Sequence, residues 1–361
     1  MPESVTVKLT TPVPKAGSSP FERIESRRFA DWSEIELSVG IDSYRCASVS
    51  GPWDPFRKDL RKAFEPLSFP EVTIEVGDEL FLTGKIQDVA PSVDATQSSV
   101  GVTAYSTAYW LTQICAQPDL PREYNNIDLK LAAQHLAGGT LGVVVNFDAS
   151  PGAKFPRVKC GPEEEIHGFL AELALQRGFV LSDTASGDLL FRSEGKLGSP
   201  VARIKGQPLG RVSAQFNPDR WFSHITGRAC KRSGQYHGSK YTQRNELYRQ
   251  IFPRHHCEST GDTGSADVPH ATKAMVGRMV AAAATYTVED LPTWRDPAGK
   301  LWQPNTTIML TAPGAMIYDE TELLIRAVKF KQRADSETAT LELVLPGSFG
   351  GTLPKKLPWD S

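Results

Sequence analysis

The fold is indicated most clearly at residues 293–305, which read Thr-Trp-Arg-Asp-Pro-Ala-Gly-Lys-Leu-Trp-Gln-Pro-Asn. Residues 296–299 predict a tight turn, because proline fixes φ at the second position and glycine accepts a positive φ at the last. The turn presents Leu301 and Trp302, and the block ends at Pro304 and Asn305. We therefore expect a loop here, followed by a strand.

A β-hairpin is predicted directly after this block. Residues 322–325 read Glu-Leu-Leu-Ile, and apolar residues beyond them recur at every second position. These positions are Val328, Phe330, Ala339, Leu341, Leu343 and Leu345. A period of two on both sides of the polar break at 333–337 is typical of an antiparallel hairpin with one buried face.

Two related blocks lie upstream. Residues 81–86 and 100–102 read as strands joined by a polar turn at 94–96, and residues 161–179 carry a helical pattern. In this order the blocks resemble those of the baseplate hub proteins of contractile-tailed bacteriophages, in particular the Mu-like hub family. The resemblance covers most of residues 20–350.

The resemblance implies a fold and an assembly. The chain would be α+β, mainly β, with two similar β-barrel tube domains that flank an α+β middle domain. Three copies would assemble as a ring-shaped homotrimer. One departure from the family pattern is Thr-Ala-Tyr-Ser at 103–106, where the family has Gly-Arg-Ser.

The resemblance also implies a function. The trimer would be a structural baseplate hub, not an enzyme, that joins the sixfold tail tube to the threefold central spike and forms a channel for DNA ejection. The implied partners are a second and third copy of the chain, the tail tube protein, the central spike protein and baseplate wedge proteins, with DNA only in transit and no membrane. No cofactor is implied. The implied location is the virion tail baseplate, assembled in the bacterial host cytoplasm.

Changes of pattern along the chain predict its domains. Residues rich in proline, serine, threonine and lysine at the N-terminus suggest a flexible arm. The expected segments are an arm at 1–20, a first β-barrel domain at 21–118, an α+β middle domain at 119–205, a second β-barrel domain at 206–350 and a tail at 351–361. A polar and helical insertion at about 231–288 interrupts the second β-barrel domain.

Two helices are predicted in the middle domain. Asp128 opens the first, and Gly138 and Gly139 stop it. The second has Pro162 at its first position and Glu163–Glu165 in its first turn, where the helix dipole favours negative charge.

The two β domains share a faint likeness. Residues 79–82 read Glu-Leu-Phe-Leu and precede a hairpin, as residues 322–325 do. An internal repeat explains this likeness, and so do two unrelated hairpins.

Composition narrows the class of protein. The chain has 40 basic and 42 acidic residues, a net charge of −2, so no global basic field favours duplex binding. Its five cysteines are dispersed without Cys-x-x-Cys spacing, which indicates reduced thiols in a cytoplasm. The first residues lack the basic and apolar regions of an export signal, and no apolar run is long enough to predict a membrane span.

Candidate interface residues come from two places. Trp294 and Trp302 are candidates for subunit contacts, although Trp302 equally fits the core of its barrel. Arg228, Arg244 and Arg249 belong to a basic stretch at 228–254 in which tyrosines are interleaved. Such a stretch suits either an interface with another subunit or the binding of single-stranded nucleic acid.

No catalytic, cofactor-binding or metal-binding residue is assigned. His255, His256 and Cys257 are contiguous, so they cannot all point at one ion, and we expect a solvated loop. The patterns Gly-x-Ser-x-Gly, His-Glu-x-x-His, Gly-x-Gly-x-x-Gly and the Walker A loop are absent from the sequence. The dipole role of Glu163–Glu165 already explains those carboxylates.

Three alternatives remain open. The first is the hub of a type VI or phage-derived contractile injection device, with the same fold. The second is a tail-tip cell-wall hydrolase. The third is a nucleic-acid-binding assembly factor, which predicts salt-dependent binding to single strands that is lost when the three arginines are neutralised.

Overall fold

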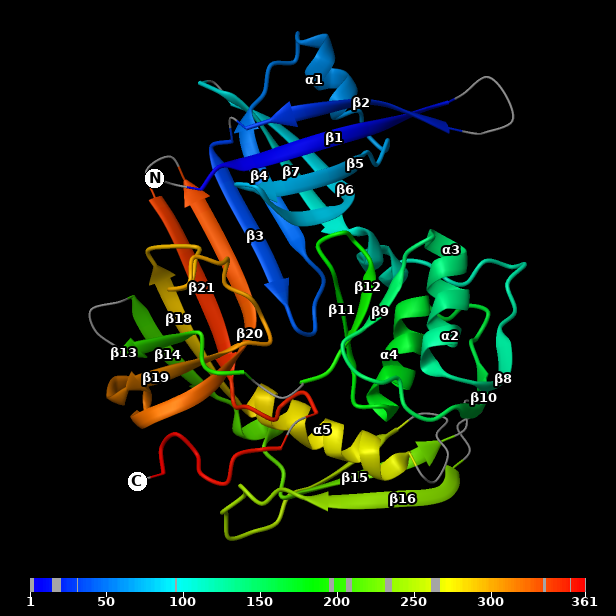
Figure 1. The fold of residues 1–361 in the computed structure, drawn as a ribbon, viewed down its shortest axis with the longest axis vertical. Helices are drawn as coiled ribbons and strands as arrows, with labels where there is room; N and C mark the ends of the chain where they lie inside the picture. Colours follow the sequence, from blue (N-terminus) through cyan, green and yellow to red (C-terminus); the bar gives the residue numbers. More distant parts are fainter. Residues whose placement is uncertain are drawn as a thin grey trace.

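The computed structural model describes residues 3–14, 21–30, 32–94, 96–194, 198–205, 210–230, 236–260, 267–333, 336–350 and 352–360. Over these residues the chain is mainly β, with one sheet of 13 strands and three small sheets (Figure 1). This confirms the predicted α+β, mainly β class. Among the described residues, no helix is both long and apolar enough to cross a membrane.

The first unit of the large sheet has five strands in the order β5-β6-β7-β4-β3. They are β3 (Glu34–Gly40), β4 (Cys46–Pro52), β5 (Glu71–Val76), β6 (Glu79–Val93) and β7 (Ser98–Ser106). Helix α1 (Lys58–Ala63) lies between β4 and β5 in the chain. Ile35, Leu37 and Val39 alternate with half-buried residues and fill the core side of β3, as the period of two predicted.

The second unit pairs its strands in the same way, in the order β19-β20-β21-β18-β14. They are β14 (Arg211–Phe216), β18 (Ala284–Leu291), β19 (Thr307–Ala312), β20 (Ile317–Arg333) and β21 (Ser336–Val344). The turn η4 (Pro313–Ala315) precedes β20, and β13 (Ala202–Lys205) pairs with β19 in parallel. The hairpin predicted from the closing sequence block is β20–β21.

The two units are a structural duplication. In each, the first part of a long strand pairs with the strand before it, and pairing with the strand after it begins just before a bulge and continues beyond it. The bulge follows Ile86 in β6 and Ile325 in β20, and matched positions around it differ by a constant 239 residues. The same difference relates Cys46 to Thr285 in the next strand.

This register corrects the alignment read from sequence. Residues 79–82 were matched to 322–325, but the equivalent of Ile325 is Ile86. The likeness arose because both segments enter a long strand with an apolar run. Pairing, and not residue type, fixes which positions are equivalent.

The units are joined edge to edge. β3 pairs antiparallel with the last part of β20, so that Leu37 lies opposite Phe330. Both side chains belong to one core that also includes residues of both units on either side of this seam. The large sheet therefore runs through both units without a break, and closure of either unit into a barrel stays a prediction.

A hairpin of β1 (Val5–Pro14) and β2 (Phe21–Phe29) extends the first unit, and β1 pairs with β5 (Figure 1). The flexible arm predicted at 1–20 is therefore corrected at residues 5–14. Val5, Val7 and Leu9 alternate and are buried, and this short period outweighs the loop-like composition of the segment.

The middle domain, at the right of Figure 1, has its own core. Its helical elements are η1 (Thr107–Thr112), α2 (Leu129–Ala133), η2 (Gln134–Gly138), α3 (Gly139–Leu141) and α4 (Ile166–Gln176). Its strands are β8 (Glu123–Ile127), β9 (Val145–Phe147), β10 (Phe155–Lys159), β11 (Val180–Asp183) and β12 (Leu189–Arg192). They form the sheets β10-β8 and β11-β12-β9.

Both predicted helices of this domain need correction at an end. Asp128 caps α2, since it accepts a hydrogen bond from Leu131 N at 2.8 Å, but the helical path continues through Gly138 and Gly139. It ends at Gly142, where φ is +71°. Helix α4 begins at Ile166 with Glu165 as its N-cap, so Pro162 lies in the preceding turn, outside the helix.

An insertion separates β14 from β18. It holds η3 (Pro218–Arg220), β15 (His224–Cys230), β16 (Tyr236–Arg244), β17 (His255–Ser259) and α5 (Val268–Ala283). The polar and helical insertion predicted at about 231–288 thus holds α5 and two strands of a small sheet, whose central strand β15 precedes the predicted stretch, and α5 packs against this sheet (Figure 1).

Two buried polar contacts fix the middle domain to the β units. Arg45 donates to the carboxylate of Asp183 through its backbone N at 2.8 Å and its guanidinium at 2.7 Å. Glu194 accepts hydrogen bonds from the backbone N–H groups of Gly347 and Phe349. Burial raises the pKa of both carboxyl groups, and the Arg45 charge partly offsets this for Asp183. The domain boundaries themselves stay a prediction.

Candidate assembly surface

The two tryptophans of residues 293–305 lie inside the molecule. Trp294 is fully buried, packs on Phe330 and donates its indole N–H to the carbonyl oxygens of Lys331 at 3.3 Å and Thr338 at 2.9 Å. Trp302 is buried beside it and donates to Thr293 O at 3.2 Å. The expectation of subunit contacts at Trp294 and Trp302 is corrected, because a buried ring cannot meet another chain. For Trp302, the core interpretation is the one observed.

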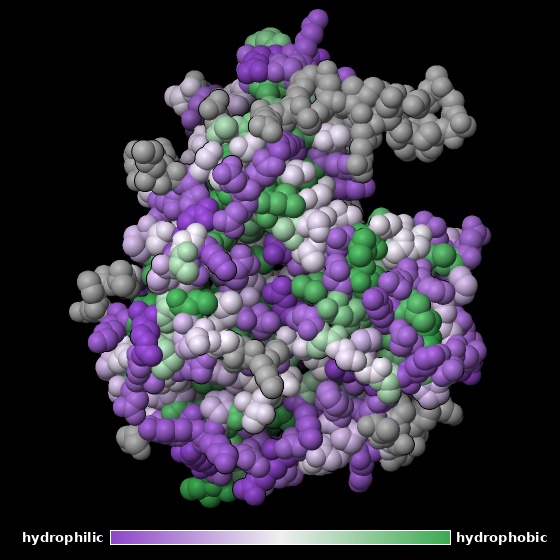
Figure 2. Space-filling view, in the orientation of Figure 1, coloured by the Kyte–Doolittle hydropathy of each residue, from purple (hydrophilic) through white to green (hydrophobic). Residues whose placement is uncertain are grey.

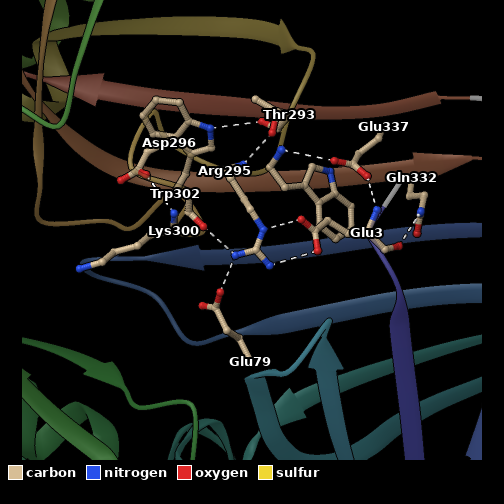
Figure 3. A network of polar contacts seen from close by, with 11 residues as sticks. Glu3, Glu79, Thr293, Arg295, Asp296, Lys300, Trp302, Gln332 and Glu337 are labelled. Atoms are coloured by element: carbon tan, nitrogen blue, oxygen red, sulfur yellow. Dashed lines mark hydrogen bonds and ion pairs between the residues drawn. The ribbon is translucent and has the colours of Figure 1, made fainter. Parts of the chain in front are cut away.

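Arg295, next to Trp294, gathers an ionic network (Figure 3). Its guanidinium points between Glu3 and Glu79 and donates to both, and it also donates to Gly299 O at 2.9 Å. These contacts, the hydrogen bond with Glu3 first, raise the pKa of Arg295 above its usual value. The network ties the start of β1 and the start of β6 to the predicted turn.

Glu3 is held from the other side as well. Its backbone N donates to Glu337 Oε2 at 2.6 Å, and Gln332 Nε2 donates to Glu3 O at 2.9 Å (Figure 3). Glu3, two residues before β1, therefore bonds to β20, β21 and the turn at once. This network stabilises the protomer and leaves the assembly surface to be sought elsewhere.

The sheet of the insertion has a basic outer face. β15 pairs with both β16 and β17, which places Lys240 beside Arg228 and places Arg244 beside His224. Since side chains alternate along a strand, the three cations share the face opposite α5, and all three are exposed. Of the sequence candidates, Arg228 and Arg244 thus lie on the same face, four residues apart along the sheet. Arg249 lies in the following loop, ion-paired with Asp360 at 2.7 Å.

Tyr241 is separated from the basic residues of this sheet. Tyr241 follows Lys240 in β16, so its ring lies on the opposite face from the cations. Single-strand binding combines both kinds of residue on one surface, and Tyr241 does not supply an aromatic ring on the basic face. His255 and His256 likewise point to opposite faces, and no cluster of metal-binding side chains occurs within the described ranges.

Among the described residues, several strand edges in the large sheet are open, those of β2 and β13 among them, and two of the open edges correspond to each other through the duplication. β14 pairs only with β18, and the part of β6 after its bulge pairs only with β7, as far as the described residues show. The bond from Asn217 N to Ala283 O turns the backbone groups of Val212, Ala214 and Phe216 toward the open side of β14. In β6, the bond from Asp94 N to Gln97 O does the same for residues 89, 91 and 93.

An apolar hollow of about 550 Å³ adjoins the end of β14. Its walls are the side chains of Phe216, Pro218, Trp221, Met316, Tyr318 and Trp359, with Asn217, Ala283 and Ala284. Phe216 packs edge-on against Trp359 with ring centroids 4.9 Å apart. Hydrophilic residues cover much of the face of the molecule shown in Figure 2, with hydrophobic residues scattered among them. An apolar hollow next to an open strand edge is a candidate contact surface.

Comparison with known proteins identifies relatives of the middle of the chain. Residues 114–193 match the family model described as the second domain of gp44-like baseplate hub proteins. This segment is similar in sequence to that hub domain. The match covers most of the middle domain, with α4 and the sheet β11-β12-β9.

The similarity extends beyond the gp44-like domain. The chain is 21% identical to baseplate hub protein gp44 of Escherichia phage Mu over 322 residues, which are 85% of this chain and 82% of that protein. It shares its fold with the 43 kDa tail protein of prophage MuSo2 from Shewanella oneidensis, at TM-score 0.75 and 19% identity over 96% of this chain and 99% of the other. A more distant fold relative is the E. coli c3393 protein of a type VI secretion system, at TM-score 0.55 and 12% identity over 90% and 76% of the two chains.

Proposed function

We propose that this protein is the structural hub of a Mu-like phage baseplate, acting as a homotrimeric ring between the tail tube and the central spike. The names of the relatives support the hub role. The ring is supported by one observation in particular, the matched pair of open edges in a duplicated sheet. The channel, the DNA that would pass through it and the virion location belong to the same proposal.

The intrachain seam shows how an open edge would be filled. At this seam, β3 of the first unit lies along the last part of β20 of the second. The equivalents of these strands are β14 and the last part of β6, which are the two corresponding open edges. A neighbouring chain that repeats the seam would therefore lay its β6 edge along β14.

The duplication fixes the register of this proposed contact. Equivalent residues of β6 and β20 differ in residue number by 239. Equivalent residues of β3 and β14 differ by 177, as Glu34 and Arg211 do. Phe216 would then lie opposite Val89 of the neighbour, and Arg211 opposite Asp94. In the seam, the corresponding positions hold Glu34 and Arg333, which form an ion pair at 2.7 Å. The proposed contact would also pair opposite charges, but here the arginine lies on β14, the counterpart of β3, and the carboxylate lies at the end of β6, the counterpart of β20.

The contact joins two different edges, so it is head-to-tail and generates a closed ring when the rotation fits. Three chains with two units each would supply six similar units, which suits a sixfold tube. The central spike and wedge proteins would bind other surfaces of the same ring, for which the basic face with Arg228 and Arg244 is a candidate.

Molar mass by light scattering, at several concentrations, tests the ring. We expect a species near three times the 39.6 kDa chain mass for the natural sequence. Ala214→Pro removes a donor that faces the open side, so it should abolish the trimer and leave monomer stability unchanged. Ser213→Pro is the matched control, because Ser213 faces β18 and its loss should destabilise the chain itself.

Two outcomes would contradict the proposal. If the natural chain stays monomeric at every concentration and also when the candidate spike protein is added, the hub assignment fails. If Ala214→Pro still forms the full trimer, the ring is not closed through β14. A hub of a type VI device remains the second candidate, because its fold relative covers most of this chain.

A further inference from the structure

The duplication of the two β units points to what the hollow beside β14 binds. One edge of β20 is filled by β19, then by residues 305 and 306, and then by β3. Ile325 bonds to the backbone of Asn305 and Thr306, and the next residue, Arg326, accepts a bond from Ile41 N at 2.8 Å. The end of β3 therefore lies directly against the loop that precedes β19.

The first unit has the same loop without a strand beside it. Ile86 N donates to Pro70 O at 3.1 Å, as Ile325 N donates to Thr306 O, so the loop at 65–70 is the counterpart of the loop at 303–306. Backbone conformation supports the match: φ is +45° at Phe69 and +66° at Asn305, its counterpart. Any strand laid along the open part of β6 must end against the loop at 65–70.

We infer that the hollow beside β14 receives Leu67 and Phe69 of a second copy of this chain. The inference rests on the proposed ring, because the strand that would end against this loop is β14 of the neighbour. Asn217 and Pro218, at the end of β14, line the hollow. The ring contact would thus bring the apolar loop of one protomer to the apolar hollow of the next.

The loop is suited to such a contact. Leu67 is 86% exposed and Phe69 is 43% exposed, yet the loop is held by the bond from Ser68 Oγ to Glu65 O at 2.7 Å and by packing of Phe69 on Trp110. Leu67 and Phe69 both have positive φ, which costs a branched or aromatic residue free energy. Exposed apolar side chains held in an unfavourable backbone indicate a contact that the isolated chain does not show.

The hollow also needs an apolar partner. Met316 and Tyr318 are about half exposed on its rim. The bond that Ile41 N makes at the intrachain seam has no counterpart here, because Pro218 stands at the equivalent position and lacks an N–H. At this end of the strand, the contact would depend on apolar burial and not on the ladder of hydrogen bonds.

The test uses two substitutions that spare the fold. Leu67→Asn and Met316→Asn each place asparagine, which tolerates positive φ, at a position with positive φ. Burying a leucine contributes roughly 1.5–3 kcal/mol, and 1.4 kcal/mol is tenfold in affinity, so each variant should weaken each ring contact about 10- to 100-fold. Val144→Asn, at an exposed apolar residue of the middle domain, is the control and should leave assembly unchanged.

A cross-linking experiment separates this inference from the proposed function. In a background where the exposed Cys115 and Cys257 are replaced by serine, Leu67→Cys combined with Met316→Cys, treated with a short bis-maleimide, should give covalent dimers and trimers of the chain, and neither single variant should. If light scattering shows a trimer but the double variant gives no more cross-links than the singles, the hollow inference fails and the ring stands. If no trimer forms at all, both fail.

Discussion

Replacement of Trp294 by phenylalanine tests whether the most informative residue of the chain acts in the core or at a subunit contact. The indole N–H is shared by the carbonyl oxygens of Lys331 and Thr338, on the two strands of the closing hairpin. Phenylalanine keeps a ring against Phe330 but donates no hydrogen bond. The substitution leaves two buried acceptors with one donor fewer and removes part of a fully buried side chain.

The expected loss of stability is about 2–5 kcal/mol. Leaving buried polar groups unsatisfied costs about 1–3 kcal/mol. The smaller ring adds about 1–2 kcal/mol for lost burial and the small cavity it leaves. Trp302→Phe makes the same ring change at the neighbouring buried tryptophan and removes one hydrogen bond, to Thr293 O, so the same two contributions predict a comparable loss of about 2–5 kcal/mol.

Urea unfolding at a fixed protein concentration measures both variants, with the free energy taken from the midpoint at unchanged slope. Light scattering on the folded protein measures assembly in parallel. A core role predicts lowered stability and a natural molar mass for the protein that remains folded. Stability within 0.5 kcal/mol of the natural chain together with loss of the trimer would refute the core argument and restore Trp294 to the interface.

Three further predictions concern the way the parts are held together. Asp183→Asn should destabilise the chain by about 3–5 kcal/mol, because buried Arg45 loses its charge partner. Asp319→Asn, which breaks an exposed ion pair with Lys356, should cost less than about 1 kcal/mol. Chemical unfolding of the two variants compares these losses. Gly277→Ala should cost about 1–3 kcal/mol, since a Cβ there would lie 2.6 Å from Ser348 O, and thermal unfolding should show Gly314→Ala, with open space around it, to be neutral. Burial lowers the pKa of His167, so the unfolded state binds the proton more tightly than the folded state does. The stability of the natural chain relative to His167→Phe should therefore fall as pH drops below about 6.5. An equal stability difference between the two proteins at pH 7 and at pH 5 would contradict this.

Local elements were predictable where a short pattern decides them. The turn at 296–299 forms as expected, with Gly299 N bonded to Asp296 O at 2.9 Å and φ of +81° at Gly299. The hairpin β20–β21 forms because its period of two leaves one face apolar. The same rule, applied to Val5, Val7 and Leu9, would have identified β1, but the surrounding prolines and serines favoured an arm.

The assembly surface was not predictable in the same way. Arg228 and Arg244 lie on the same face of the small sheet only because the pairing of β15 with β16 sets their register. Trp294 was misplaced because a tryptophan in a turn carries no local sign of the two carbonyl groups that receive its N–H. The open edge of β6 did leave a signal, since Pro91 inside a strand pattern indicates an edge.

The open edges also explain how a chain of this kind avoids indiscriminate association. β14 has six residues, and the open part of β6 carries Asp88 and Pro91, features that make an edge a poor template for foreign strands. Pro91 removes one donor from the proposed contact, yet it leaves Val89 and Val93 to pair in the one register that the intrachain seam defines. Repetition of that seam closes after six units only if each unit is turned from the last by one sixth of a full circle. The angle between the two units within one chain is therefore the quantity that selects a trimer over any other ring.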